Sequence, residues 1–443
     1  MQAGPDHEIC FSACLAGAGR DDGAGDVFCR VCFHVGSAHD WGWVCGSGGG
    51  AGCWLARGDG GWGGGMKIAY VYDAVYPWIK GGAEKRVYEI SKRLVERGHE
   101  VHWFGLKWWD GEKDIVKDGI YLHGIGEWDD LYVDGRRSIR EGIYFGLKTL
   151  TGLKGDFDVI DCQEFPYFPC FFAKAHSLVK RSALVITWYE IWGDYWFEYL
   201  GKKGVFGWMV ERLTAKLPKL AVPISETIKE DLKTLKVSES IIRVVPNGVD
   251  FYRLQEIRPS DEKFDVIYVG RLISHKNVDV LLRAISIVRE RIPDVRCGIV
   301  GDGPMMNELR AMSNGLDLDE NVRFSGFIES DEDVYARMKS SKVFVLPSTR
   351  EGFPNTILEA NSCGLPAIIV RHEKNAGVGV VKDGYNGFIL NLSPDEIAER
   401  IVYLLQNENE LDGLSKNAME FAKGYDWGVI VEKIERVYEE ALT

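Results

Sequence analysis

Long apolar runs are missing from this sequence of 443 residues. No stretch reaches the about 18 apolar residues that a membrane-spanning helix needs, so we expect no transmembrane segment. The N-terminus also lacks a basic segment followed by an apolar stretch of the kind that directs secretion. Together the two absences predict a cytoplasmic protein.

Basic residues are also in the minority. The chain has 53 Lys and Arg against 66 Asp and Glu, which gives a net charge of −13 and argues against a nucleic-acid-binding protein. The acidic excess lies in residues 251–443, whereas residues 66–250 are close to neutral. A neutral first half tolerates an anionic surface better, which favours a peripheral contact with the inner membrane face.

Residues 1–65 lack lysine and show no helical or strand periodicity. Their glycine-rich composition cannot bury enough apolar area to offset its ordering entropy. A zinc site is one interpretation of the cysteines and the histidine here, but the spacing is loose and no second Cys-x-x-Cys follows. The residues in question are Cys29, Cys32, His34 and Cys45. We expect a disordered or artefactual extension without metal, and a fold that starts at Met66.

From Met66 onward, short apolar runs alternate with helical patterns. The expected strands of a first sheet read MKIAYVYD, VHWFGL, FDVID, ALVIT and LAVPIS. Those of a second sheet read VIYVG, CGIVG, VRFSGF, VFVLPS, PAIIV and GFIL. Unbroken apolar runs between helices are typical of parallel sheets covered on both faces. We predict an α/β fold with two Rossmann-like, doubly wound domains, residues 66–245 and 246–424, that face a central cleft.

The segment EGFPNTILEA places two carboxylates, Glu351 and Glu359, eight positions apart. A helix that begins near Asn355 would present its N–H groups to a phosphate. Glu359, one turn into that helix, can accept two hydrogen bonds from a ribose diol, and Glu351 can bind the hydroxyls of a sugar. The alternative is a helix-capping acid with a solvated glutamate, and this segment alone does not decide between the two.

The segment GRLISHKN follows the expected strand VIYVG and brings Arg271 and Lys276 to its carboxyl end. Two cations there would stabilise a departing diphosphate, because negative charge develops on it as the glycosidic bond breaks. Two solvated basic residues at a helix start are the alternative, which is disfavoured because cations lie unfavourably at the positive end of a helix.

The order and spacing of these motifs resemble the retaining family-4 glycosyltransferases (glycosyl transferases group 1), which have the GT-B fold. The resemblance covers residues 66–443. It is carried by the Arg-x4-Lys and Glu-x7-Glu pairs, PNGVD (246–250), VGDGP (300–304) and the Gly81-Gly82 loop. It implies transfer of a sugar from a nucleotide sugar, expected to be a UDP-sugar, to a glycan or lipid-linked acceptor. It also implies retention of anomeric configuration, with the donor as substrate and neither a metal nor another cofactor.

The resemblance further implies roles for single residues. Arg271 and Lys276 hold the diphosphate, Glu359 holds the ribose, and Glu351 contacts the donor sugar. The remaining donor-binding positions are Gly81, Gly82, Gly352, Phe353, Pro354 and Asn355. The closing segment, residues 425–443, resembles the C-terminal helix that returns to the first domain in such enzymes.

One position departs from the family pattern. Members commonly carry a histidine after the strand that corresponds to ALVIT, and here Tyr189 stands at that position. A phenol can donate a hydrogen bond to the sugar, but it cannot be a cation near neutral pH. We keep Tyr189 among the catalytic candidates, with a non-catalytic nucleotide-sugar-binding protein as the alternative. A GT-B epimerase or phosphorylase is a further alternative, whereas a dehydrogenase is disfavoured because no G-x-G-x-x-G opens a βαβ unit.

Residues 188–208 are dense in aromatic side chains. Most such stretches are core. The functional alternative is an acceptor groove, for stacking on a sugar ring or for docking a lipid-linked acceptor at a membrane surface.

Overall fold

The computed structural model describes residues 65–129, 131–133 and 136–443, together with the two short strands β1 (Gly42–Trp43) and β2 (Leu55–Ala56). These two strands pair antiparallel. The chain divides into two compact units, Met1–Gly64 and Gly65–Thr443, and both large sheets belong to the second unit. The cysteines and the histidine that suggested zinc lie outside the described residues.

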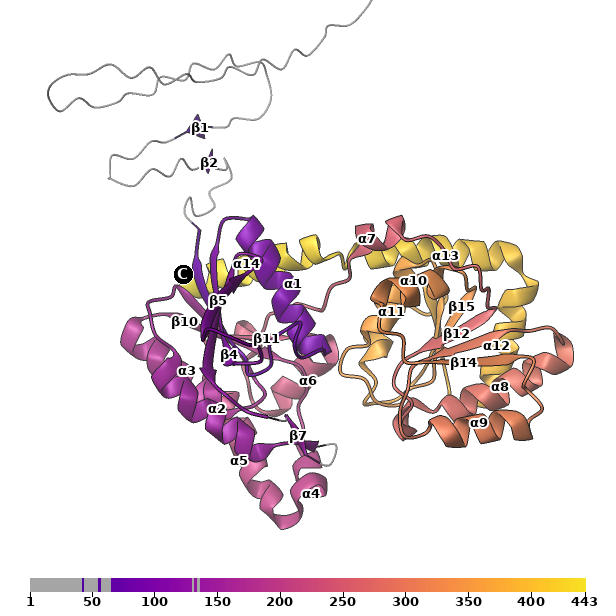
Figure 1. Cartoon of the computed structure of the whole chain (residues 1–443), viewed down its shortest axis with the longest axis horizontal. Coiled ribbons are helices and arrows are strands. Elements are labelled where there is room, and N and C mark those ends of the chain that lie inside the picture. Colours follow the sequence, from indigo (N-terminus) through magenta and orange to yellow (C-terminus); the bar gives the residue numbers. More distant parts are fainter. Residues whose placement is uncertain (1–41, 44–54, 57–64, 130, 134–135) are drawn as a thin grey trace, which may run out of the picture. The chain divides into compact units, whose positions relative to one another are not determined.

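The first sheet, drawn in indigo to magenta in Figure 1, has seven strands in the order β11-β10-β9-β3-β4-β6-β5. Its strands are β3 (Lys67–Val71), β4 (Glu100–Leu106), β5 (Asp114–Lys117), β6 (Ile120–Gly126), β9 (Val159–Gln163), β10 (Ala183–Trp188) and β11 (Leu220–Pro223). All neighbours pair parallel except β5 and β6. The chain runs outward from β3 to β4 on one side and returns through β9 on the other. The topological switch point therefore lies between β3 and β9.

Helices and a short hairpin accompany this sheet. They are α1 (Gly82–Glu96), β7 (Tyr132–Val133), β8 (Arg136–Arg137), α2 (Ile139–Gly152), α3 (Phe168–Lys180), α4 (Tyr195–Leu200), α5 (Gly204–Thr214) and α6 (Glu226–Thr234). Serines begin α2 and α6, because the Ser138 and Ser225 hydroxyls accept hydrogen bonds from N–H groups of the first turn. We call this sheet, with the helices packed on it, the first domain.

The second sheet has six parallel strands in the order β14-β13-β12-β15-β16-β17. Its strands are β12 (Val266–Val269), β13 (Cys297–Val300), β14 (Val322–Gly326), β15 (Val343–Leu346), β16 (Ala367–Val370) and β17 (Gly387–Leu390). The helices are α7 (Phe251–Glu256), α8 (Val278–Arg291), α9 (Met306–Gly315), α10 (Asp331–Lys339), α11 (Asn355–Ser362), α12 (Pro394–Gln406) and α13 (Glu408–Lys423). The switch point of this second domain lies between β12 and β15.

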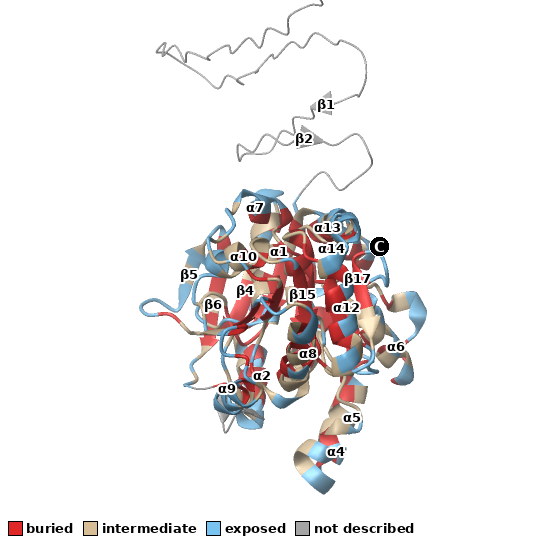
Figure 2. Ribbon diagram, turned by 90° about the vertical axis from the view of Figure 1, so that its right-hand side faces the viewer, coloured by how far each residue is buried: buried red, intermediate tan, exposed pale blue. Residues whose placement is uncertain are grey.

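The predicted pair of parallel α/β sheets is confirmed. Buried residues gather in the strands and on the helix faces that meet them (Figure 2). Two strands of the first sheet, β5 and β6, were not predicted. Burial in β5 alternates between exposed and intermediate, so that strand does not read as a buried apolar run.

The last helix, α14 (Trp427–Leu442), belongs to the core of the first domain although it follows the second in sequence. Its buried face includes Ile430, Ile434 and Tyr438. The Tyr438 hydroxyl donates a hydrogen bond of 2.6 Å to Asp161 on β9 and lies 2.7 Å from the Tyr70 hydroxyl on β3. A polar network therefore ties the end of the chain to the two central strands of the first sheet.

Candidate active site

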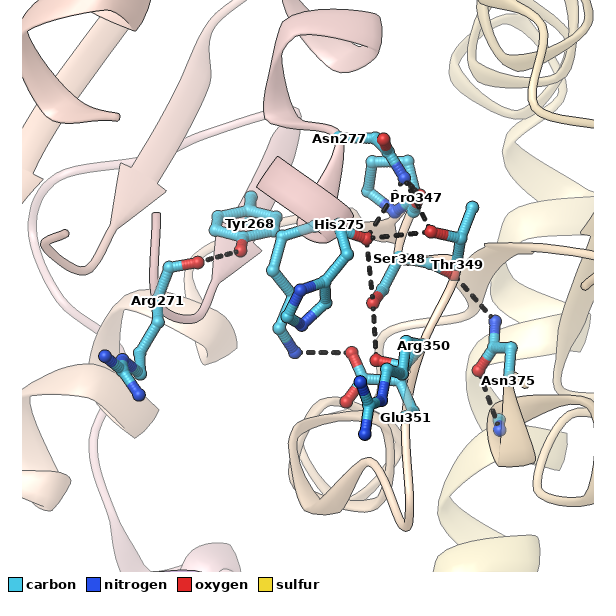
Figure 3. Close-up of polar contacts among 12 residues, drawn as sticks. Tyr268, Arg271, His275, Asn277, Pro347, Ser348, Thr349, Arg350, Glu351 and Asn375 are labelled. Carbon is cyan, nitrogen blue, oxygen red and sulfur yellow. Dashed lines mark hydrogen bonds and ion pairs between the residues drawn. The ribbon is translucent and has the colours of Figure 1, made fainter. Parts of the chain in front are cut away.

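The second domain places its candidate residues at its switch point. Arg271 follows β12, Lys276 ends a short 3-10 helix (Ser274–Lys276), and Glu351 follows β15. Lys276 donates a hydrogen bond to Glu351, and both side chains are largely buried. The Arg271 side chain is exposed and lies apart from this ion pair, while its carbonyl oxygen accepts a hydrogen bond of 3.0 Å from Tyr268 (Figure 3).

The loop after β15 is held against the 3-10 helix by one carbonyl group. The carbonyl oxygen of His275 accepts hydrogen bonds from the Thr349 amide at 2.9 Å, the Thr349 hydroxyl at 3.2 Å and the Asn277 amide at 3.1 Å (Figure 3). Asn277 adopts a left-handed conformation with φ of 50°, which asparagine tolerates better than most residues. These contacts fix the segment that carries Glu351.

The expected helix near residue 355 is confirmed as α11. Glu359 lies in it and accepts a hydrogen bond of 3.1 Å from the Tyr335 hydroxyl. Burial raises the pKa of Glu359, and the ammonium group of Lys85 on α1 partly offsets this rise. Lys85 itself forms an ion pair of 3.2 Å with Asp331 on α10. Glu359, the residue expected to bind the ribose, therefore lies where α1 of the first domain meets the second domain.

Glycines permit a close approach between the two domains at the cleft. A Cβ atom at Gly82 would lie 3.3 Å from the side-chain nitrogen of Asn355, and one at Gly352 would lie 3.2 Å from the carbonyl oxygen of Tyr189. Across the same cleft the Asn247 amide donates a hydrogen bond of 3.0 Å to Asn355. Larger side chains at these glycines would push the loops apart.

Tyr189 lies directly after β10 and is held both by its hydroxyl group and by its backbone N–H. Its hydroxyl donates a hydrogen bond of 2.6 Å to the side-chain oxygen of Gln163, and its backbone N–H donates one of 3.0 Å to Glu164. Burial raises the pKa of Tyr189 well above its ordinary value, with Arg86 acting in the opposite direction. The phenol is therefore neutral at physiological pH.

A hollow of about 320 Å³ opens between the two domains. Its walls combine several of the site residues predicted from the sequence with residues of the first domain that had no predicted role. They are Tyr72, Gly82, Ala83, Arg137, Glu164, Phe165, Tyr189, Glu190, Trp192, Ile224, Asn247, Gly352, Phe353 and Asn355. A second hollow of about 350 Å³ shares Tyr189, Glu190, Trp192 and Gly352 with it and is also lined by Arg350 and Glu351. Tyr189 thus borders both spaces.

The structure brings most sequence-predicted residues to this cleft and adds others that had no predicted role. Gly82, Tyr189, Gly352, Phe353 and Asn355 line the first hollow, and Glu351 lines the second. Arg271, Lys276, Gly81, Pro354 and Glu359 do not appear in the walls of either hollow. The missed wall residues include the polar side chains of Arg137, Glu164 and Asn247. The available signal for Glu164 was its position at the end of a predicted strand, and for Asn247 its place in PNGVD.

The part of the chain that the structure describes offers neither a metal site nor a membrane-spanning helix. No group of three or more His, Cys, Asp or Glu side chains there could hold a metal ion. No helix among the same residues is both long and apolar enough to cross a membrane.

Known proteins share this arrangement. Residues 80–253 match the model of Glycosyltransferase Family 4, and residues 253–421 match that of Glycosyl transferases group 1. The structure of Anabaena HepE in complex with UDP and glucose superposes with a TM-score of 0.64 at 20% identity, over 85% of this chain and 100% of that one. The two sheets and the cleft between them therefore define a protein of the GT-B class. Within that class, the chain belongs to the family-4 glycosyltransferases.

Two curated relatives match over part of their length. An uncharacterized glycosyltransferase of Methanocaldococcus jannaschii is 30% identical over 222 residues, 49% of this chain and 58% of that protein. The UDP-Gal:alpha-D-GlcNAc-diphosphoundecaprenol alpha-1,3-galactosyltransferase of Escherichia coli is 31% identical over 255 residues, 53% of this chain and 64% of that protein. The chain thus matches less than two thirds of either relative.

Proposed function

We propose that this protein transfers a sugar from a UDP-sugar to a lipid-linked glycan, with retention of anomeric configuration. One observation carries the proposal. A hollow in the cleft is lined by polar and aromatic side chains of the first domain and by Gly352, Phe353 and Asn355 of the second, and a second hollow that shares part of its wall reaches Glu351. Ligands of doubly wound sheets bind at such positions.

The donor half suits a diphosphate. Lys276 and Arg271 supply positive charge, and the N-terminus of α11 supplies N–H groups. As the bond between the anomeric carbon and the diphosphate oxygen breaks, its electron pair passes to the diphosphate, where the two cations stabilise the new charge. In a front-face reaction the same diphosphate takes the proton of the attacking hydroxyl. A neutral phenol at Tyr189 therefore suffices, because no side chain has to act as the base.

The acceptor half suits a lipid-linked substrate. Helix α5 exposes Val205, Phe206, Met209 and Leu213, and α2 exposes Ile139, Ile143, Leu147 and Leu150. Exposed Lys202 and Lys203 directly precede α5. An amphipathic helix with basic residues at its start is suited to lie at an anionic membrane surface. The E. coli relative is named for an acceptor linked to diphosphoundecaprenol, which agrees with this choice.

A donor and acceptor panel tests the proposal. UDP-galactose, UDP-glucose, UDP-N-acetylglucosamine and GDP-mannose are each incubated with N-acetylglucosamine linked through a diphosphate to a short alkyl chain. We expect release of UDP and an α-linked disaccharide product, identified by mass spectrometry and proton NMR. Tight UDP binding without turnover of any donor would instead support the non-catalytic alternative, and a donor isomerised without acceptor would support the epimerase.

A further inference from the structure

Glu164 is a buried carboxyl group with one oxygen fixed and one oxygen free. It follows β9, at the switch point of the first sheet, and its residue is 1% exposed. Oε1 accepts hydrogen bonds from the backbone N–H groups of Tyr189, at 3.0 Å, and Glu190, at 3.3 Å. Oε2 is buried and has no hydrogen-bond partner among the described residues. The group is therefore oriented by the protein but only half satisfied.

The residue that carries this oxygen borders the first hollow. Glu164 lines that space together with residues of both domains. Leaving a buried polar oxygen without a partner costs free energy in the folded state, and such costs are concentrated at functional sites. Burial raises the pKa of Glu164, and so does the neighbouring Glu190 carboxylate, although the backbone N–H groups of Tyr189 and Glu190 act in the opposite direction. A hydroxyl group in the hollow would satisfy the oxygen.

An aromatic surface lies beside this carboxyl group. The rings of Phe165 and Trp192 are stacked at 5.7 Å with an angle of 22° between their planes, and both line the same hollow. The Trp192 indole N–H donates a hydrogen bond of 2.6 Å to Glu190, which fixes the ring. Flat apolar faces with a few oriented polar groups are what a small polar ligand such as a sugar ring requires.

We propose that Oε2 of Glu164 forms a hydrogen bond with a ring hydroxyl of the acceptor's terminal sugar, whose face packs on Phe165 and Trp192. The inference rests on the proposed function and deepens it, because it locates the acceptor sugar. In the reaction the acceptor oxygen forms a bond to the anomeric carbon, the carbon–diphosphate bond breaks, and the proton moves to the diphosphate. Glu164 is left unchanged and acts by binding and orienting the acceptor.

The test is a split between acceptor and donor kinetics. With the alkyl diphosphate-linked N-acetylglucosamine as acceptor, Glu164→Ala should raise the acceptor KM about tenfold or more. The donor KM should rise less than the acceptor KM, since the donor is affected only through the lost hydrogen bonds from Tyr189 and Glu190 to Oε1. Glu198→Ala, at an exposed position on α4, is the control. A parallel rise in donor KM, or no change in acceptor KM, would overturn the proposal.

A second measurement starts from the wild-type protein, so its first part does not depend on how well the variant folds. Acceptors that lack one ring hydroxyl at a time are compared with the wild-type protein, by KM or by inhibition constant. One of them should lose the same factor as Glu164→Ala, and the variant should lose no more on that acceptor. Independent, additive losses for every deoxy acceptor would contradict the contact. If the wild type transfers sugar but these results fail, only the role of Glu164 is wrong, whereas an inert wild type overturns the proposed function as well.

Discussion

Lys276 and Glu351, 75 positions apart in the chain, form an ion pair at the switch point of the second domain. The sequence predicted that both contact the donor, one through its phosphates and one through its sugar. In the structure they hold each other, with 16% and 11% of their side-chain surfaces exposed. A diphosphate that binds Lys276 must share or replace this partner. If the donor binds Lys276 as proposed, its binding is coupled to the position of the Glu351 carboxylate.

The first prediction separates the two cations. Arg271→Ala should weaken UDP binding by about tenfold to a hundredfold, because a charge-assisted contact contributes roughly 1.5–3 kcal/mol. Its side chain is exposed, so the melting temperature should not change. Lys276→Ala should weaken UDP binding similarly and also lower the melting temperature, because it leaves the Glu351 carboxylate without its partner. Calorimetric titration with UDP and thermal melting measure both effects.

The exposed Lys263, outside the cleft, provides the control as Lys263→Ala. Wild-type affinity for UDP in Arg271→Ala and Lys276→Ala would show that the phosphates bind elsewhere.

The second prediction concerns recognition of the ribose. Glu359→Ala should reduce the preference for a UDP-sugar over its 2′-deoxyuridine counterpart by about tenfold or more, measured as the ratio of kcat/KM values. Tyr335→Phe should reduce it less, because the Tyr335 hydroxyl only orients the carboxylate. Glu332→Ala, at an exposed position on α10, should leave the ratio unchanged. An undiminished preference in Glu359→Ala would contradict the ribose role.

The third prediction tests Tyr189. Tyr189→Phe removes the hydrogen bond to Gln163 and should lower kcat by up to about tenfold, which corresponds to roughly 0.5–1.5 kcal/mol. Tyr189→His should retain or exceed wild-type turnover. Tyr88→Phe, which removes a comparable bond to the exposed Asp118, is the control and should match wild type. If Tyr189→Phe also matches wild type, the phenol serves packing and not the reaction.

The fourth prediction uses a buried carboxyl group. Burial raises the pKa of Asp161 from its ordinary value of 3.8 to about 6. The folded state therefore binds this proton more tightly than the unfolded state, so the stabilisation is present below pH 4 and is lost as the pH rises through 6. The variant Asp161→Asn has a side chain at this position that does not titrate. The free energy of unfolding of this variant, relative to that of wild type, should therefore increase by up to about 3 kcal/mol between pH 4 and pH 7.

Urea unfolding at both pH values measures this difference. Asp110→Asn, at an exposed position, is the control and should show the same pH dependence as wild type. An equal dependence in Asp161→Asn would mean that Asp161 has an ordinary pKa in the folded protein.

The fifth prediction addresses the membrane. Phe206→Asp on α5 should lower binding to vesicles of phosphatidylglycerol and phosphatidylcholine by about tenfold, because it replaces an exposed apolar side chain with a charge. Phe327→Asp makes the same change at an exposed position of the second domain and should have little effect. Sedimentation with vesicles gives both values. Equal losses in the two variants would point to a general charge effect instead of docking through α5.

The sequence predicted the parts of the fold that depend on local pattern. The buried runs of β3 and β12 were recognisable because a parallel strand covered on both faces is apolar throughout. The β5 strand was not, because it pairs at the edge of the sheet and alternates exposed with half-buried residues.

The candidate site also contains residues that the sequence identified and residues that only the fold identified. Residues in spaced motifs, such as Lys276 and Glu351, could be named in advance, although their mutual ion pair could not. Glu164 was missed because the orientation of its carboxyl group depends on N–H groups about 25 positions further along the chain. A glutamate after a strand is otherwise indistinguishable from a solvated one.

The return of α14 to the first domain has a consequence for how the chain is made. Trp427, Ile430 and Tyr438 complete a core whose central strand, β3, lies near the start of the described fold. During translation, the first sheet to leave the ribosome must therefore wait for the last residues before its buried network with Asp161 can close. The second domain, whose core contains no residue of α14, can finish folding earlier. The domain synthesised first is completed last.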